Sequence, residues 1–372
     1  MKTSGPAPDR WRSLSRPQRI AALAVGGAAL LLAVVLAVVL TVGGRTSPGR
    51  TEAGPQPAGP TPAPTAPSSP STPASPSAPS SPTDRAGVSP LTGLPGGAGR
   101  IVAVKIDNAA PARPQTGVNA ADVVYAIEVE GGISRLLAIY DSDHLPAGDR
   151  IGPVRSARES DLPVLQQYGR VDFAYSGAQS RFLPVLAGAD VVNCSPQQTG
   201  VPYFRGREKA APFNLYVVPS EILRSCPGTA QARDVGFRFG GAPAGGVPTG
   251  SYGARMPSAS FTFTWSAAQG RYLVATDGRP AMTTDAGQMG APTIVVQKVA
   301  ETTSPLGLVD SAGAVLPFAP TVGSGEAVFL RDGMAYRGSW SRPDAAAGTE
   351  FSYAGRRMPF HPGQVWIVLE PA

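Results

Sequence analysis

The clearest structural signal in the sequence comes from residues 123–140, which read Val-Val-Tyr-Ala-Ile-Glu-Val-Glu-Gly-Gly-Ile-Ser-Arg-Leu-Leu-Ala-Ile-Tyr. Two runs rich in β-branched and other apolar residues flank the pair Gly131 and Gly132. Glycine readily adopts the positive φ angles of a two-residue hairpin turn, and β-branched residues favour strands. The stretch therefore predicts a β-hairpin with a two-residue Gly-Gly turn.

The predicted turn also determines which hairpin residues face each other. With a two-residue loop, Glu128 pairs with Arg135, and the alternation of side chains places both on one face with Glu130. Two interpretations remain open. The charges form a cross-strand ion pair at a solvated hairpin tip, which contributes roughly 0.2–1 kcal/mol. Alternatively, the arginine orients two carboxylates for acid–base chemistry or for holding a cation.

Strand and helix signals occur together in the first half of the folded part. Residues 100–107 predict a strand, and residues 156–168 and 220–226 predict helices, the first of them interrupted by Pro163. From about residue 227, short β-like runs alternate with Gly- and Pro-rich turns. We therefore predict an α+β fold class, in which a mixed α/β N-terminal domain is followed by a mostly antiparallel β domain.

The N-terminal part of the chain has a different composition. Residues 20–42 form an uncharged apolar run that is long enough, as a helix, to cross a bilayer. Arginines precede it, so the positive-inside rule predicts a cytoplasmic tail at residues 1–19 and extracytoplasmic folded domains. The run exceeds the apolar region of about 7–15 residues in a cleaved signal peptide. No cysteine follows it directly, so we predict an uncleaved, single-pass signal anchor rather than a lipid anchor.

A linker and two domains are predicted beyond this segment. Residues 43–89 are rich in Pro, Ser, Thr and Ala and predict a disordered stalk. Residues 90–226 and 227–372 are the predicted N-terminal and C-terminal domains. The net charge of the chain is +6, but most of the excess lies in residues 1–19. The nearly neutral remainder argues against a nucleic-acid partner.

Three polar loops contain more arginine and amide side chains than packing requires. They lie directly after the strand that ends at Asp107, in residues 151–158 and in residues 205–214. Arginines in loops shaped by Gly and Pro suit a carboxylate or a phosphate, although a solvated loop in an Arg-rich protein is an equally good interpretation. The candidate ligand-binding residues are Asn108, Arg113, Gln115, Arg135, Arg155, Ser156, Arg158, Arg205, Arg207 and Asn214. The candidate catalytic residues are Asp107, Glu128 and Glu130.

Other chemistry has little support in the sequence. Cys194 and Cys226 fall outside the membrane in the predicted topology, which favours a disulfide, with two buried free thiols as the alternative. Two Cys and two His far apart do not form the usual zinc clusters, so we expect no metal. No nucleophile-elbow, Walker or dinucleotide signature occurs, so we expect no cofactor. His144 and His361 lie in predicted loops, where we expect structural or exposed side chains.

Several motifs support a family resemblance. They include residues 104–108 (Val-Lys-Ile-Asp-Asn), 129–135 (Val-Glu-Gly-Gly-Ile-Ser-Arg), 151–158 (Ile-Gly-Pro-Val-Arg-Ser-Ala-Arg), 211–216 (Ala-Pro-Phe-Asn-Leu-Tyr) and 362–367 (Pro-Gly-Gln-Val-Trp-Ile). Through these motifs, the chain from about residue 90 to its C-terminus resembles the YerB-like family of bacterial lipoproteins, also described as domain of unknown function 3048. The resemblance implies an extracytoplasmic, envelope-associated protein with two domains, and it assigns no catalytic role.

Two hypotheses of function follow. The first is a membrane-anchored, non-catalytic envelope module that binds an anionic cell-wall ligand or an envelope protein through its N-terminal domain. The alternative is a hydrolase or transferase that acts on wall glycan or peptide through Asp107, Glu128 and Glu130. A structural spacer without a ligand is a third, weaker hypothesis.

Overall fold

The computed structural model describes residues 87–148, 150–198, 200 and 203–372. The predicted cytoplasmic tail, the predicted membrane anchor at residues 20–42 and nearly all of the predicted stalk lie outside the described residues. Among the helices within the described ranges, none is both long and apolar enough to cross a membrane.

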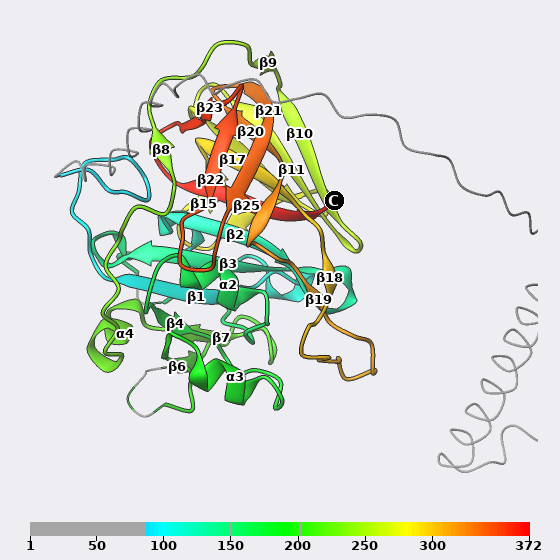
Figure 1. The fold of residues 1–372 in the computed structure, drawn as a ribbon. Coiled ribbons are helices and arrows are strands. Elements are labelled where there is room, and N and C mark those ends of the chain that lie inside the picture. Colours follow the sequence, from blue (N-terminus) through cyan, green and yellow to red (C-terminus); the bar gives the residue numbers. More distant parts are fainter. Residues whose placement is uncertain (1–86, 149, 199, 201–202) are drawn as a thin grey trace, which may run out of the picture. The chain divides into compact units, whose positions relative to one another are not determined.

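One large sheet dominates the described part of the chain (Figure 1). Its strands follow the order β23-β22-β21-β20-β17-β25-β2-β3-β1-β4-β5, and β9 pairs with β21. The strands from the first half are β1 (Ile101–Asp107), β2 (Val123–Glu128), β3 (Ser134–Asp141), β4 (Asp172–Ala174) and β5 (Val192–Asn193). Those from the second half are β9 (Val247–Pro248), β17 (Thr293–Val299), β20 (Gly323–Arg331), β21 (Met334–Arg342), β22 (Glu350–Tyr353), β23 (Arg356–Arg357) and β25 (Val365–Pro371).

The last strand joins the two halves. β25 lies between β2 and β17 and is parallel to both, with Val124 and Ile294 each level with Trp366. Parallel strands in the middle of a sheet are covered on both faces, which accounts for the nearly unbroken apolar run of β25. Strands from both sides of the predicted domain boundary at residue 227 share this sheet. The boundary itself stays a prediction.

A second sheet packs on one face of the first. It consists of β10 (Ser251–Met256), β11 (Ala259–Ser266), β12 (Arg271–Thr276), β13 (Arg279–Pro280) and β16 (Gly290–Ala291). Phe261 and Phe263 on β11 share a core with Trp366, Val124 and Val104 of the large sheet. The strict alternation of buried residues along β11 and β12 reflects one face on this core and one toward solvent.

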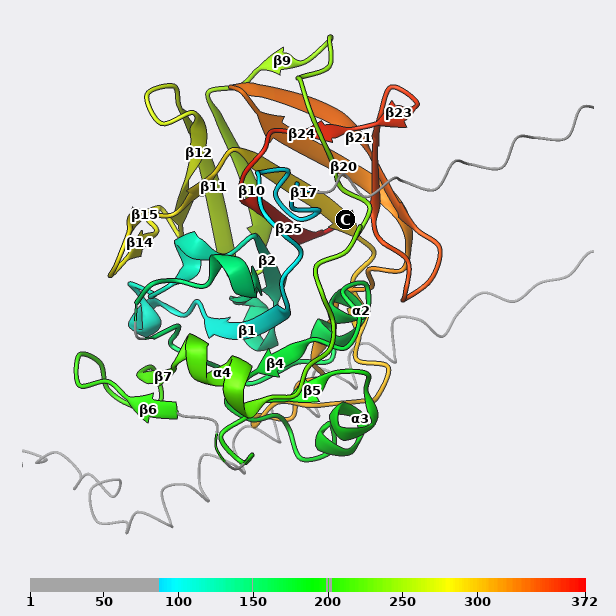
Figure 2. The same ribbon diagram turned by 90° about the vertical axis from the view of Figure 1, so that its left-hand side faces the viewer.

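Short elements complete the fold. Four strand pairs lie apart from the two sheets: β6 (Tyr203–Arg205) with β7 (Leu215–Val217), β8 (Arg238–Phe239) with β24 (Pro359–Phe360), β14 (Met282–Thr283) with β15 (Gly287–Gln288), and β18 (Thr302–Thr303) with β19 (Pro317–Phe318). The 3-10 helices are η1 (Ala110–Ala112), η2 (Val118–Ala120), η3 (Glu130–Gly132) and η4 (Ser142–His144). Figure 2 shows α3, α4 and the β6–β7 pair at the end of the molecule opposite β20 and β21.

The predicted α+β fold class is wrong, because strands far outnumber helices among the described residues and form one large sheet. Their α-helices are α2 (Asp161–Gln166), α3 (Leu183–Gly188) and α4 (Pro219–Ser225), of six or seven residues each. Pro163 lies in the first turn of α2, and Gly169, with a φ of 83°, lies just beyond its C-terminal end. Proline is tolerated only near a helix start, so the helix predicted from residue 156 begins five residues later.

The hairpin forms, but its register differs from the prediction by one residue. The turn contains three residues, Glu130–Gly132, and the backbone N–H of Val129 donates to the carbonyl of Ile133 at 2.8 Å. Glu128 therefore pairs with Ser134, and Arg135 pairs with Ile127. A shift of one residue moves a side chain to the opposite face, so Glu128 and Arg135 point to different sides of the sheet.

Candidate functional site

The candidate site begins where β1 ends and β3 begins. Asp107 and Arg135 lie side by side in the antiparallel β1–β3 ladder, and every residue of both strands is buried. Both faces of these strands are covered, since residues of β1–β3 belong to both hydrophobic cores. Charged groups in such a position require partners, because a buried unpaired charge is very costly.

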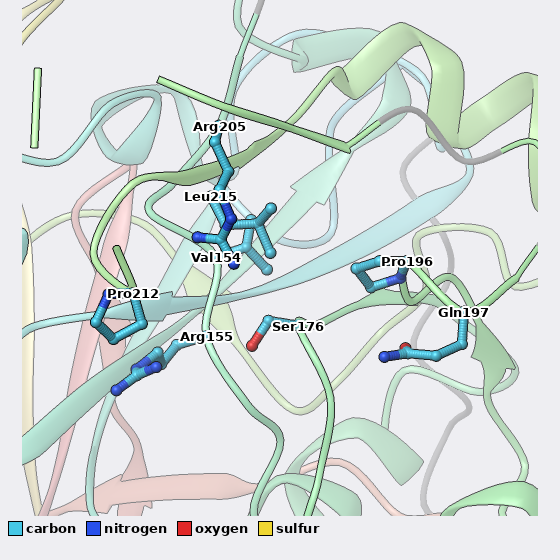
Figure 3. A pocket seen from close by; sticks show the side chains of 8 residues that line it. All are labelled: Val154, Arg155, Ser176, Pro196, Gln197, Arg205, Pro212 and Leu215. Carbon is cyan, nitrogen blue, oxygen red and sulfur yellow. The ribbon is translucent and has the colours of Figure 1, made fainter. Parts of the chain in front are cut away.

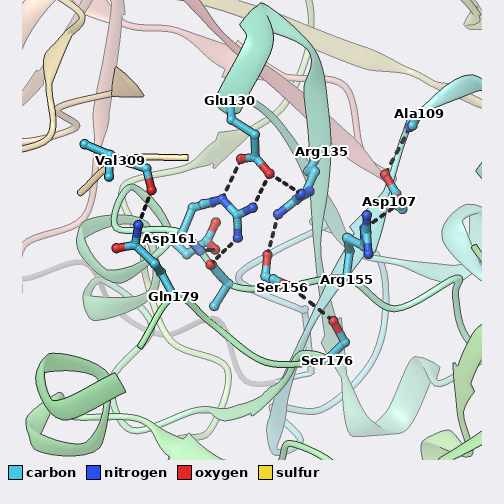
Figure 4. Close-up of polar contacts among 12 residues, drawn as sticks. Asp107, Ala109, Glu130, Arg135, Arg155, Ser156, Asp161, Ser176, Gln179 and Val309 are labelled. Carbon is cyan, nitrogen blue, oxygen red and sulfur yellow. Dashed lines mark hydrogen bonds and ion pairs between the residues drawn. The ribbon is translucent and has the colours of Figure 1, made fainter. Parts of the chain in front are cut away.

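Glu130 at the hairpin tip supplies one of these partners (Figure 4). Its Oε1 lies 2.7 Å from Nη2 of Arg135, and its Oε2 accepts a hydrogen bond of 2.7 Å from Nε of Arg158. Nη2 of Arg158 also donates to the same carboxylate. Arg135 donates from Nη1 to the carbonyl of Ser156 at 2.9 Å. The turn thus holds a carboxylate between two guanidinium groups from different segments.

Asp107 extends this arrangement to Arg155. Its Oδ2 lies 2.9 Å from Nε of Arg155, and its Oδ1 accepts a hydrogen bond from the backbone of Ala109. We refer to Asp107, Glu130, Arg135, Arg155 and Arg158 as the arginine network. The network contains three cations and two anions, so it has one uncompensated positive charge.

Burial and charge shift the pKa values within the arginine network. Burial and the neighbouring charge of Arg158 lower the pKa of Arg135 to about 10. Burial alone would raise the pKa of Glu130, but the hydrogen bond from Arg158 and the charges of both arginines lower it to about 2. Glu130 is therefore ionised at neutral pH and acts as a fixed anion rather than as a proton donor.

A fully buried ion pair helps to position the arginine network. Nζ of Lys105 lies 2.6 Å from Oδ1 of Asp161, and neither side chain is exposed. Oδ2 of Asp161 accepts the backbone N–H of Arg158 at 2.7 Å, which positions the start of α2 and the arginine before it. Burial lowers the pKa of Lys105. Its amine lies in the core, where no ligand reaches it.

A cavity of about 270 Å³ lies beside Arg155 (Figure 3). It is lined by Val154, Arg155, Ser176, Pro196, Gln197, Arg205, Pro212 and Leu215. The guanidinium carbon of Arg155 lies 5.5 Å from the ring centre of Phe213, a cation–π contact that adds to its ion pair with Asp107. Nη1 of Arg205 donates to Oδ1 of Asn214 at 2.8 Å. Both arginines of this cavity are therefore held in place by neighbours.

The remaining amide candidates belong to a separate buried cluster. Nδ2 of Asn108 donates to Oγ of Ser134 at 2.8 Å, and Nε2 of Gln115 donates to Oδ1 of Asn108 at 2.9 Å. Arg113 donates to the carbonyl of Asn108 at 2.6 Å and forms an ion pair with Asp277 at 2.7 Å. These contacts tie the loop after β1 to the hairpin and to the second sheet.

Glu128, the other carboxylate of the hairpin, has a different environment. It is 5% exposed, and its partner is the carboxyl group of Glu301 rather than an arginine. Burial and the neighbouring charge of Glu301 raise the pKa of Glu128 to about 7. Burial also raises the pKa of Glu301. At neutral pH, one proton held between the two carboxyl groups is therefore more favourable than two negative charges.

The predicted site residues therefore fall into several groups. The structure brings together Asp107, Glu130, Arg135, Arg155, Ser156 and Arg158. Arg155 and Arg205 line one cavity, and Asn214 accepts a hydrogen bond from Arg205. Asn108, Arg113 and Gln115 lie in the separate cluster, Glu128 lies on the other face, and Arg207 is exposed outside the cavity lining. The sequence reasoning missed Ser176, Gln197 and Phe213, which no local motif distinguishes.

The histidines and cysteines have other surroundings. Nδ1 of His144 lies 2.9 Å from Oδ1 of the buried Asp122, a pairing that raises the pKa of His144 despite partial burial. Cys194 and Cys226 form a disulfide with a Cα–Cα distance of 6.0 Å. Asp172 lies close to both sulfur atoms, but sulfurs in a disulfide are not thiolate ligands. This is the one group of potential metal ligands found among the described residues.

A larger cavity of about 920 Å³ lies elsewhere, between the start of the described chain and residues 231–240. Its charged side chains have partners within the chain. Arg238 pairs with Asp234 at 2.9 Å, and Arg233 donates from Nε to the carbonyl of Gln167 at 2.9 Å. The smaller cavity is the stronger candidate for an anion site, because Arg205 with its neutral partner Asn214 lies there beside Arg155 of the arginine network.

The fold and site thus define a class of protein: a two-sheet, mostly β domain with a buried arginine network beside a small cationic cavity. Residues 91–233 match the family model described as "Protein of unknown function (DUF3048) N-terminal domain", and residues 253–367 match its C-terminal domain model. The chain belongs to this family, as the sequence motifs predicted.

YerB of Bacillus subtilis illustrates the match in both sequence and structure. A segment of 60 residues is 50% identical to the Bacillus subtilis protein named "Putative lipoprotein YerB" and covers 16% of this chain and 17% of that protein. The crystal structure of the YerB protein from Bacillus subtilis resembles the fold with a TM-score of 0.62 at 21% identity, covering 77% of this chain and 97% of that one. At this identity the structural likeness concerns the fold alone.

Proposed function

We propose that the protein is an extracytoplasmic, membrane-anchored protein of the cell envelope that binds an anionic ligand at the cavity of Arg155 and Arg205. The family membership and the description of a relative as a lipoprotein support the envelope location. Residues 20–42 have the length and the flanking arginines of a membrane anchor, and we propose them as the attachment.

The observation that carries the proposal is the position of Arg155. This side chain belongs to the arginine network and also lines the cavity beside Arg205, whose partner Asn214 is neutral, so the lining keeps one positive charge for a ligand. Its side chain is 26% exposed, whereas Asp107, its partner, is 2% exposed. An anion in the cavity reduces the excess charge without displacing the buried carboxylate.

The preorganised arginines favour binding in a second way. Ordering a free arginine on a ligand costs conformational entropy, and that cost is smaller when neighbours already hold the side chain. The ring of Phe213 and the amide of Asn214 provide this for Arg155 and Arg205, respectively. The ligand is an anionic group of a wall polymer or an acidic group of an envelope protein.

The alternative of a wall hydrolase or transferase has less support. Asp107 is paired with Arg155, two arginines keep the carboxylate of Glu130 ionised, and Glu128 lies on the opposite face of the sheet. Glycoside hydrolysis by a carboxyl pair requires one protonated and one ionised carboxyl group that reach the same substrate. The three candidates do not meet this condition.

Binding to isolated cell walls and to envelope extracts tests the proposal. The full-length chain in detergent should cosediment with one of them, and Arg205→Gln should reduce the bound fraction severalfold. The matched control is Arg207→Gln, since Arg207 is an exposed arginine two residues away that does not line the cavity. The absence of wild-type binding, or equal losses for the two variants, would contradict the proposal.

A further inference from the structure

We infer that the cavity selects a small carboxylic acid with a neutral amide or hydroxyl group nearby, such as an acidic sugar or the carboxyl end of a peptide, rather than a phosphate. The inference rests on the proposed function and deepens it by naming the ligand class. The charge and size of the cavity and the arrangement of its lining side chains support it.

The charge of the cavity favours a singly charged anion. Its lining contains two cations, Arg155 and Arg205, and Asp107 already compensates Arg155 at 2.9 Å. Arg205 pairs with the neutral amide of Asn214, so one positive charge remains in the lining, while the excess charge of the arginine network lies with Arg135 and Arg158, which share Glu130. A phosphate monoester carries about −1.5 to −2 at neutral pH, whereas a carboxylate carries a single charge. A carboxylate therefore leaves the site close to neutral.

The size of the cavity favours a terminal group. Its volume of about 270 Å³ lies below the range of roughly 300–1,000 Å³ for pockets that enclose drug-sized ligands. A phosphodiester is also singly charged, but it lies inside a chain and carries a substituent on each side. A carboxylate ends a chain or a side branch, so it enters a small space without a second substituent.

The lining is also asymmetric. Figure 3 shows Arg155, Arg205 and Pro212 on one side, Pro196 and Gln197 on the other, and Ser176 between them. Oγ of Ser176 has a long contact of 3.4 Å with Oγ of Ser156, which leaves it available to a ligand. The anionic end of a ligand meets the arginines, and a neutral hydrogen-bonding group meets Ser176 and Gln197.

The geometry of the arginines suits a carboxylate as well. Arg155 uses Nε for Asp107, and Arg205 uses Nη1 for Asn214, so each guanidinium keeps further N–H groups for a ligand. Two oxygens of a carboxylate accept about four hydrogen bonds, which two guanidinium groups supply. Proline and leucine side chains of the lining provide apolar contact for the body of the ligand.

Calorimetric titration of the full-length chain with matched probes tests the inference. N-acetylmuramic acid and N-acetylglucosamine differ by a carboxylate-bearing group, and N-acetylalanylalanine and its amide differ by the terminal charge. We expect the acid of at least one pair to bind roughly tenfold more tightly than its neutral partner. The pair with the larger difference identifies the source as a sugar or a peptide end.

N-acetylglucosamine 6-phosphate and a glycerol phosphodiester complete the set. Tighter binding of either phosphate than of both acids overturns the inference and leaves the proposed function standing. Binding of none of the anions, while the protein is folded, contradicts both. These outcomes separate the failure of the ligand class from the failure of the anion site.

Two variants test which lining residue contacts the anionic end of the ligand and which contacts the neutral end. Arg205→Gln should weaken the preferred acid roughly tenfold, and Gln197→Leu should weaken it several-fold while leaving binding of acetate unchanged. Both residues are exposed, so the variants should remain folded, which far-ultraviolet circular dichroism verifies. Arg207→Gln is the control and should bind as the wild type does. Unchanged affinity in Arg205→Gln would overturn the assignment.

Discussion

Asp107 and Arg135 are cross-strand neighbours in the β1–β3 ladder, yet each pairs its charge with a residue from another segment. Asp107 contacts Arg155 at 2.9 Å, and Arg135 contacts Glu130 at 2.7 Å. The ladder thus brings two opposite charges together, and each forms its ion pair elsewhere: Arg135 with the hairpin tip and Asp107 with the segment before α2. This sharing makes the candidate site part of the folded core, so its charges influence stability as well as binding.

Removing the carboxylate of Glu130 should destabilise the protein. Glu130→Gln leaves Arg135 and Arg158 without their anion, and the side chain of Arg135 is only 4% exposed. Breaking a buried pair costs about 3–5 kcal/mol, and the partial exposure of Glu130 reduces the expected loss to about 2–3 kcal/mol. Urea unfolding measures it. Glu208→Gln, which breaks the exposed pair with Arg150, should cost much less. Equal losses for the two variants would contradict the role of Glu130.

The Glu128–Glu301 pair should make stability depend on pH. Burial and the charge of Glu301 raise the pKa of Glu128 from 4.5 to about 7, so folding favours its protonated form. The stability from this pair is fully present below the unfolded pKa of 4.5 and is lost as pH rises through about 7. Glu128→Gln removes this dependence, so its advantage over wild type in unfolding free energy should increase between pH 4.5 and pH 8.

Glu301→Gln provides a second test of this effect. It removes the other member of the pair, so its difference from wild type in unfolding free energy should also increase from pH 4.5 to pH 8. A substitution outside the pair, Glu326→Gln, should change stability equally at both pH values because Glu326 is exposed on β20. A pH dependence in Glu128→Gln that matches the wild type would show that the pair does not titrate as expected.

The two glycines of the hairpin turn should differ in their tolerance of a side chain. Gly131 and Gly132 have φ angles of 72° and 71°, so alanine is strained at both, by roughly 1–2 kcal/mol. A Cβ on Gly131 meets nothing within 4 Å, whereas a Cβ on Gly132 would lie 2.7 Å from Cβ of Pro257. Gly132→Ala should therefore lower the melting temperature further than Gly131→Ala. The same shift in both variants would mean that the contact with Pro257 yields easily.

Trp366 should stabilise the packing between the N-terminal and C-terminal halves of the described chain. It is fully buried on β25, packs near Phe261 with a ring separation of 6.5 Å, and donates from Nε1 to Oε1 of Gln364 at 3.1 Å. Truncation of a buried tryptophan costs about 3–5 kcal/mol. Trp366→Ala should lose that much in urea unfolding, and Trp265→Ala, at a partly exposed site, should lose less. A single transition in both proteins would show that the halves unfold together.

Local patterns predicted the individual strands well. The apolar alternation around Gly131 and Gly132 predicted the hairpin, and the family motifs led to the correct family. The register of the turn was less accessible, because Gly-Gly fits both a two-residue and a three-residue loop. The difference of one residue separated Glu128 from Arg135 and left Glu130 as the carboxylate that meets the arginines.

The sequence by itself determined the strand-forming segments, the turn glycines and the arginine-rich loops, since backbone preference and side-chain chemistry act over a few neighbouring residues. Only the tertiary structure decided that β25 joins the two halves and that Arg155 and Arg205 line one cavity with Ser176 and Gln197. Those relationships depend on contacts between distant segments, and many topologies satisfy the same local preferences. The burial of the arginine network follows from strands covered on both faces, a property of the whole sheet rather than of any one segment.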